Sequence, residues 1–152
     1  FELDLAKTIF QDKISWDRVR LDENARLGTH GGKYAFVTYF YINCIGHMTL
    51  PILIHELVHV LQYQQEGSKY AFRNMVAHFF PNTYNYGGLE KLKYINAHPS
   101  LIHLLNYEQR ADVFSDYARL LLGQRPEWGN AQLKDGITYF KVMKLLLTIG
   151  NR

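Results

Sequence analysis

The feature that most constrains the fold of this chain is the sequence His-Glu-Leu-Val-His at positions 55–59. Thr49 can cap a helix and Pro51 is tolerated in a first turn. The helical apolar spacing continues through Gln65 and stops before Gly67, so we predict a helix here. On a helix, residues four apart share one face with Cβ atoms about 5–6 Å apart, so both imidazoles can reach one zinc ion.

A catalytic zinc ion with two histidine ligands needs a third protein ligand and an open position for water. Glu108 and Asp112 are four residues apart in a segment that Asn106 can cap, so they share a helical face. We expect Glu108 to bind the metal and Asp112 to accept the distal N–H of a liganding histidine. The competing third ligands are His78, His98 and His103. Position 65 is Gln65, which excludes the third histidine of an HExxHxxGxxH arrangement.

These residue types point to metal-assisted amide hydrolysis. A zinc ion held by two neutral imidazoles and one carboxylate lowers the pKa of its bound water to about 7. Glu56 follows the first ligand directly and is the expected general base, which passes the proton to the leaving amine. A further donor should stabilise the oxyanion, and the candidates for that role are Tyr84, Tyr86, His98 and His103.

Other interpretations of the same residues stay open. The two histidines could be core residues beside a surface glutamate, and the acidic pair could be an exposed face balanced by Arg110 and Arg119. A zinc ion could also act as a structural staple in a binding module without proteolysis. A peptidoglycan amide hydrolase would use the same chemistry, because HExxH does not specify what flanks the amide.

The rest of the chain predicts an α+β fold in a single domain spanning residues 1–152. Leu5 to Ile14 has helical spacing, and Arg18 to Leu21 could form a short strand. Tyr34 to Cys44 is dense in aromatic and β-branched residues, which suits one bent strand or two short paired ones. We therefore expect a small, mainly antiparallel sheet before the HExxH helix. Further helices are predicted over Tyr70 to Phe80, Asn106 to Leu122 and Ala131 to Ile149, with a site-lining loop over Asn82 to Gly88.

Composition excludes several classes of protein. Hydrophobic residues make up 47% and charged residues 20%, which is typical of a globular domain. The net charge is only +3 and no basic block occurs, so no nucleic-acid partner is expected. No apolar run approaches the ~18–20 residues of a membrane span, so we expect no membrane insertion. The single cysteine, Cys44, excludes an internal disulfide and is interpreted as a small buried hydrophobe.

Two stretches of 8 and 12 residues, HELVHVLQ (His55 to Gln62) and NYEQRADVFSDY (Asn106 to Tyr117), resemble known proteins. They look like zincin metallopeptidases of the gluzincin type, and more narrowly the metallopeptidase effector domains associated with type VI secretion spike (VgrG-type) proteins. The resemblance implies a zincin-like fold with one zinc ion on His55, His59 and Glu108, and Glu56 as the catalytic acid/base.

The narrower resemblance also implies a biological setting. It predicts an antibacterial toxin domain that cleaves a protein or peptide substrate, delivered by a secretion spike protein and acting in the periplasm of a target bacterium. A cognate immunity protein would then be a further partner. Since the chain starts at Phe1 rather than methionine, we expect it to be a piece of a longer polypeptide or a processed product.

Overall fold

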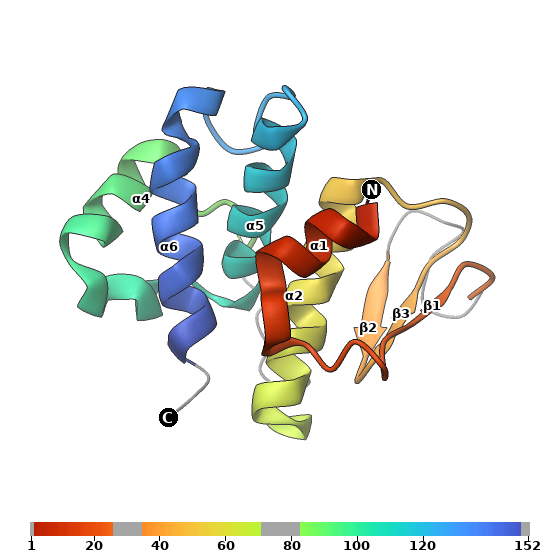
Figure 1. Ribbon diagram of the computed structural model, residues 1–152. Coiled ribbons are helices and arrows are strands. Elements are labelled where there is room, and N and C mark those ends of the chain that lie inside the picture. Colours follow the sequence, from red (N-terminus) through yellow and green to blue (C-terminus); the bar gives the residue numbers. More distant parts are fainter. Residues whose placement is uncertain (1, 26–34, 71–82, 150–152) are drawn as a thin grey trace.

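The computed structural model describes residues 2–25, 35–70 and 83–149, and its elements form successive layers (Figure 1). A small sheet packs on one side of helix α2 (Leu50–Glu66), and helix α5 (Tyr107–Leu121) packs on the other side. Helices α6 (Gly136–Ile149) and α4 (Gly88–Ala97) follow as outer layers. The described part of the chain also contains α1 (Glu2–Phe10) and the 3-10 helices η1 (Gln11–Lys13), η2 (Pro99–Leu104) and η3 (Leu133–Asp135). The predicted α+β class is confirmed.

The sheet is mixed, so the prediction of a mainly antiparallel sheet was wrong. Its strands are β1 (Arg20–Asp22), β2 (Phe36–Thr38) and β3 (Tyr41–Asn43), in the order β1-β3-β2. A two-residue loop joins β2 to β3 and forces them to be antiparallel. No short turn fixes the direction of β1, and it pairs with the free edge of β3 in parallel. The stretch Tyr34 to Cys44 therefore holds two short paired strands, one of the two alternatives predicted.

Helix α2 begins and ends close to the predicted bounds. Thr49 is its extended N-terminal neighbour, although the hydroxyl makes no capping hydrogen bond, and Pro51 lies in the first turn. Gly67 has φ +61, a left-handed conformation that favours glycine and ends the helix. The helix buries apolar residues towards the sheet and α5, and with them the polar side chains of Glu56, His59 and Gln62.

Helix α5 is fixed at its start by Asn106. The Asn106 side chain accepts a hydrogen bond from the backbone N–H of Gln109, whose side chain accepts one from the N–H of Asn106. The Asn106 amide also donates to the carbonyl of Thr83. This capping box sets where the first turn begins, and Glu108 lies within that turn.

Two helical features differ from the sequence-based expectation. Helix α4 was not predicted, although Leu89, Leu92 and Ile95 recur at helical spacing and the last two are buried. Helix α6 starts at Gly136 rather than Ala131, because Gln132 and Asp135 form a capping box around η3. The helix predicted over Tyr70 to Phe80 lies, apart from Tyr70, outside the described residues.

Buried apolar side chains from the sheet and from α1, α2, α4, α5 and α6 form a hydrophobic cluster. Cys44 belongs to it, as expected, with 5% of its surface exposed. Among the helices described, none combines the length and the apolar character that crossing a membrane requires.

Replacing the cap of α5 should weaken the helix that carries Glu108. Asn106→Ala should lower the free energy of unfolding by about 1 kcal/mol and the melting temperature by about 2–4 °C, measured by circular dichroism. The control is Asn130→Ala, which removes an exposed hydrogen bond to Arg125 and should have a smaller effect. Equal melting temperatures for the two variants would contradict the capping role.

Candidate metal centre

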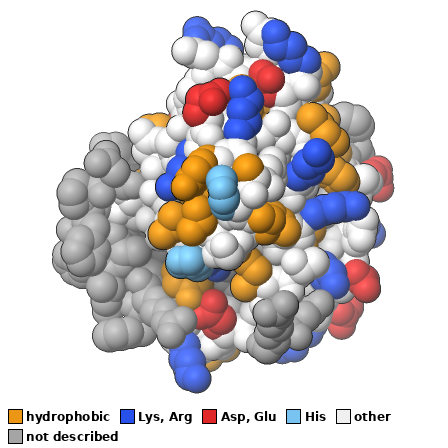
Figure 2. All heavy atoms as spheres, turned by 90° about the vertical axis from the view of Figure 1, so that its left-hand side faces the viewer, with side chains coloured by type: hydrophobic (Ala, Val, Ile, Leu, Met, Phe, Trp, Pro, Cys, Tyr) orange, Lys and Arg blue, Asp and Glu red, His pale blue; other side chains and the backbone are white. Residues whose placement is uncertain are grey.

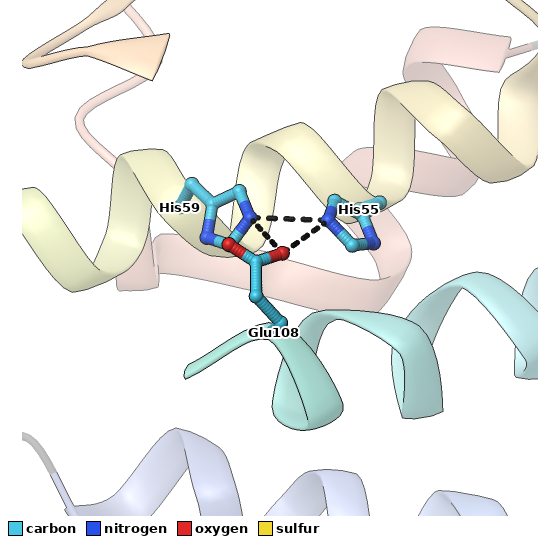
Figure 3. Close-up of side chains that lie close together, drawn as sticks. All are labelled: His55, His59 and Glu108. Atoms are coloured by element: carbon cyan, nitrogen blue, oxygen red, sulfur yellow. Dashed lines mark hydrogen bonds and ion pairs between the residues drawn. The ribbon is translucent and has the colours of Figure 1, made fainter. Parts of the chain in front are cut away.

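Three donor atoms from α2 and α5 converge on one point (Figure 3). The Nε2 atoms of His55 and His59 lie 3.1 Å apart. Glu108 Oε2 lies 3.1 Å from the His55 nitrogen and 3.2 Å from the His59 nitrogen. His59 and Glu108 are buried, and His55 is partly buried. The structure thus brings together the three residues that the sequence predicted as ligands, and this cluster could hold a metal ion.

The hydrogen bonds on the far side of each ring decide which nitrogen carries the proton. His55 Nδ1 lies 2.7 Å from Asp112 Oδ1, and because a carboxylate only accepts, the proton is on Nδ1. His59 Nδ1 lies 2.8 Å from Gln62 Oε1, whose amide nitrogen donates to the carbonyl of Tyr107. This second bond turns the oxygen of Gln62 towards His59 and favours the proton on Nδ1, where the hydroxyl of Tyr70 at 2.7 Å can accept it as well. In their neutral forms both rings therefore present Nε2 lone pairs towards Glu108.

The distances fit a tetrahedral ion. Metal–ligand bonds of about 2.0–2.1 Å in a tetrahedron place neighbouring donor atoms about 3.3–3.4 Å apart. The three observed separations of 3.1–3.2 Å are close to that value. Two lone pairs and one carboxylate oxygen at this separation repel one another unless protons or a metal ion lie between them. The donor set and its geometry therefore suit a metal ion.

The electrostatics of the three ligands point the same way. Burial alone would lower the pKa of His55, but its hydrogen bonds to Asp112 and Glu108 outweigh burial and raise the pKa to about 10. Burial would lower the pKa of His59 as well, but the negative charge of Glu108 beside it outweighs burial and raises that pKa. Burial would raise the pKa of Glu108, but the two imidazoles hold it well below its ordinary value. The carboxylates thus stabilise positive charge at the imidazoles, whether a proton or a metal ion carries it.

A cavity of about 650 Å³ opens onto these donors. Ala35 to Val37, at the sheet edge formed by β2, line one side, and Tyr84 and Trp128 are among the residues that line it elsewhere. Glu56 also faces this cavity, and its Oε2 is buried with no hydrogen-bond partner in the described part of the chain. Burial raises the pKa of this carboxyl. A buried carboxylate oxygen without a partner, beside a cation site, is available to a molecule that enters the cavity.

The four candidate oxyanion donors lie in different places. Tyr84 lines the cavity, with its ring centroid 6.4 Å from that of His55. Tyr86 is buried and its hydroxyl donates to Asp116 instead. His98 and His103 are exposed and bond to the carbonyls of Tyr94 and Ser100. They belong to the end of the molecule around α4 and η2, where histidines lie among hydrophobic side chains (Figure 2). Tyr84 is therefore the candidate whose position suits the role.

The structure tests two of the three alternative third ligands. His98 and His103 are not in the cluster with His55 and His59, because they lie at the α4 and η2 end. His78 lies outside the described residues.

Two contacts at the site were not predicted from the sequence. Trp128 donates its indole N–H to Asp112 Oδ2 at 2.7 Å, and the hydroxyl of Tyr70 lies 2.7 Å from His59 Nδ1. Trp128 comes from an irregular segment after α5, so no periodic pattern relates it to Asp112. Gln62 carried a weak signal, because it continues the polar stripe of His55 and His59 along α2.

Comparison with protein-family models, with curated proteins and with solved structures found no match to this chain. A function for this chain is therefore inferred from the geometry of the metal centre and from the two motifs that form it.

The cluster predicts that the purified chain holds about one equivalent of a divalent metal, measured by mass spectrometry. His59→Ala and Glu108→Ala should each lose most of that metal, because two protein donors remain. His103→Ala is the matched control, since it removes an exposed histidine outside the cluster and should keep the metal. Metal retained by Glu108→Ala but lost by His103→Ala would overturn the assignment of the third ligand.

Proposed function

We propose that this chain is a zinc-dependent metallopeptidase of the zincin type that hydrolyses peptide bonds. The observation that carries the proposal is the convergence of His55, His59 and Glu108 within 3.2 Å, at the edge of a cavity that Glu56 also lines. Two histidines and one glutamate are a donor set of catalytic zinc sites, which leave a fourth position for water. The resemblance of the two motifs to gluzincins supports the same activity.

The roles of the residues follow from their positions. His55, His59 and Glu108 would hold zinc, and when bound the ion would supply an acidified water and polarise the scissile carbonyl. Glu56 would take a proton from that water and deliver it to the leaving amine. Asp112 and Gln62 orient the two imidazoles by accepting their Nδ1 protons. Tyr84 would donate from its hydroxyl to the oxyanion.

The edge of the sheet offers a way to bind an extended peptide. Strand β2 lies at the edge of the sheet, and Phe36 and Val37 line the cavity. A peptide that added a strand to this edge would make main-chain hydrogen bonds independent of its sequence. Its scissile bond would then run past the donors on α2. A protein or peptide is therefore the substrate class we propose.

The biological part of the proposal is an antibacterial effector, delivered by a secretion spike protein to the periplasm and neutralised in the producing cell by an immunity protein. The support for this part is the resemblance of the motifs. A peptidoglycan peptide carries the same amide group, so purified cell wall belongs beside a protein panel in any assay. Release of cell-wall fragments without protein cleavage would identify the chain as a peptidoglycan amide hydrolase.

Replacing Glu56 separates chemistry from metal binding. Glu56→Gln should keep the zinc, because the ligands are unchanged, and should lower cleavage by about 10²–10⁴-fold, because an amide cannot accept the proton. Zinc content and turnover on the protein panel measure the two effects. The matched control is Glu90→Gln on the exposed face of α4, where the carboxylate pairs with Lys93, and it should cleave at the parent rate. Parent-rate cleavage by Glu56→Gln would eliminate the general-base role.

Removing the metal distinguishes an enzyme from a binding module in which zinc only stabilises the fold. Chelation with EDTA should abolish cleavage but leave the far-ultraviolet circular dichroism native, because α2 and α5 also contribute to a shared apolar core. Zinc added back should restore cleavage. If the chain unfolds on chelation and cleaves no substrate when loaded with zinc, the result would favour a purely structural zinc ion.

A further inference from the structure

The carboxylate of Asp112 is held at both of its oxygens. Oδ1 accepts the Nδ1 proton of His55 at 2.7 Å, and Oδ2 accepts the indole N–H of Trp128 at 2.7 Å. A carboxylate with one bond on each oxygen cannot rotate about its Cβ–Cγ bond without losing one of them. The indole of Trp128 thus fixes the plane of the carboxylate, and the carboxylate fixes the plane of the His55 ring.

Trp128 needs support of its own, because it lies in an irregular segment between α5 and η3. That support comes from Asp116, which is 1% exposed. Its Oδ1 accepts the backbone N–H of Glu127 at 2.6 Å, and its Oδ2 accepts the backbone N–H of Trp128 at 3.1 Å. Asp116 follows Asp112 by one helical turn. Helix α5 therefore carries both the carboxylate that receives the indole and the carboxylate that holds the backbone of Trp128.

The buried carboxylate of Asp116 is anchored in turn by two tyrosines. Tyr86 donates its hydroxyl proton to Asp116 Oδ2 at 2.7 Å and accepts from the hydroxyl of Tyr139 on α6 at 2.9 Å. The backbone beside Trp128 also packs closely on the start of α4, where a Cβ on Gly88 would lie 3.3 Å from the Trp128 carbonyl oxygen. Asp116 on α5 and the segment from Tyr86 to Gly88 therefore hold the backbone of Trp128.

We propose that Asp116 and Trp128 are positioning residues of the metal centre, acting in series: Asp116 places the indole, the indole orients Asp112, and Asp112 orients His55. Partners of this kind usually set metal affinity by 10–100-fold. The proposal rests on the proposed function only in taking the cluster as a zinc site. It does not require that the chain cleave any substrate.

The test is a double-mutant cycle on zinc affinity, measured by competition with a chromophoric chelator. Trp128→Phe removes the indole N–H and should weaken zinc binding by about 10–100-fold. Asp116→Asn removes an acceptor for the backbone of Trp128 and should weaken zinc binding by about 10-fold. Since both substitutions act through the hydrogen bond from Trp128 to Asp112, the zinc affinity of the double variant should lie within about threefold of that of the weaker-binding single variant.

The sequence offers a matched control in its other tryptophan. Trp16 donates its indole N–H to the carbonyl of Gln11, also at 2.7 Å, so Trp16→Phe removes an equal bond elsewhere and should bind zinc like the parent. The visible spectrum of the Co²⁺-loaded protein gives a second readout, because it reports ligand geometry rather than stability. It should change in Trp128→Phe and stay unchanged in Trp16→Phe.

Two outcomes would overturn the proposal. The first is parent affinity and an unchanged Co²⁺ spectrum in Trp128→Phe, and this variant decides alone if Asp116→Asn does not fold. The second is a double variant whose loss is the product of the two single losses, which would mean that the two residues act independently. Either result would leave the proposed peptidase activity intact, because that activity is tested through Glu56 and not through this network.

Discussion

The antiparallel contact between α2 and α5 is the constraint on which the rest of the site depends. His55 contacts both Asp112 and Glu108, His59 contacts Glu108, and Gln62 reaches the carbonyl of Tyr107 at the start of α5. Residues further along α2 therefore contact residues nearer the start of α5, which makes the two helices antiparallel. Neither helix carries all three candidate ligands, so the cluster that could hold a metal ion forms only where the two helices pack.

Burying this many polar groups requires that they satisfy one another. Glu56, His59, Glu108, Asp112 and Asp116 are all at most 8% exposed. A buried charge without a partner destabilises a fold by several kcal/mol, and most of these side chains hydrogen-bond to another polar group. The notable exception in the described part of the chain is Glu56, whose Oε2 faces the cavity without a partner. An unsatisfied carboxylate is expected where an incoming water or substrate completes the network.

The sheet and helix α6 lie on opposite sides of the α2–α5 pair (Figure 1). The sheet lies on one side of α2 and contributes its β2 edge to the cavity. On the other side, α5 is backed by α6, whose Tyr139 lies at the far end of the hydrogen-bond network that reaches Asp112 through Tyr86, Asp116 and Trp128. Hydrogen bonds that begin at Tyr139 on α6 thus reach Asp112, which contacts the candidate ligand His55.

The sequence alone allowed good predictions wherever a rule of local geometry applied. Helical spacing places His55 next to His59 and Glu108 next to Asp112, and Asn106 and Gly67 mark helix ends that the structure confirms. Helix α4 carried the same kind of signal in Leu89, Leu92 and Ile95 and could have been predicted. The sequence also allowed Glu108 and Asp112 to be placed beside His55 and His59, because a zinc site with two histidine ligands needs a third protein donor.

Tertiary packing decided the rest. The parallel pairing of β1 with β3 joins two strands that no short turn connects, so no local signal sets their direction. The choice of Tyr84 over Tyr86, His98 and His103 at the cavity, and the bond from Trp128 to Asp112, join segments that no periodic spacing relates. Local sequence fixes which side chains share a face of one helix, because the helical repeat is constant. Which faces meet depends on how the whole core packs, and that information is spread over the entire chain.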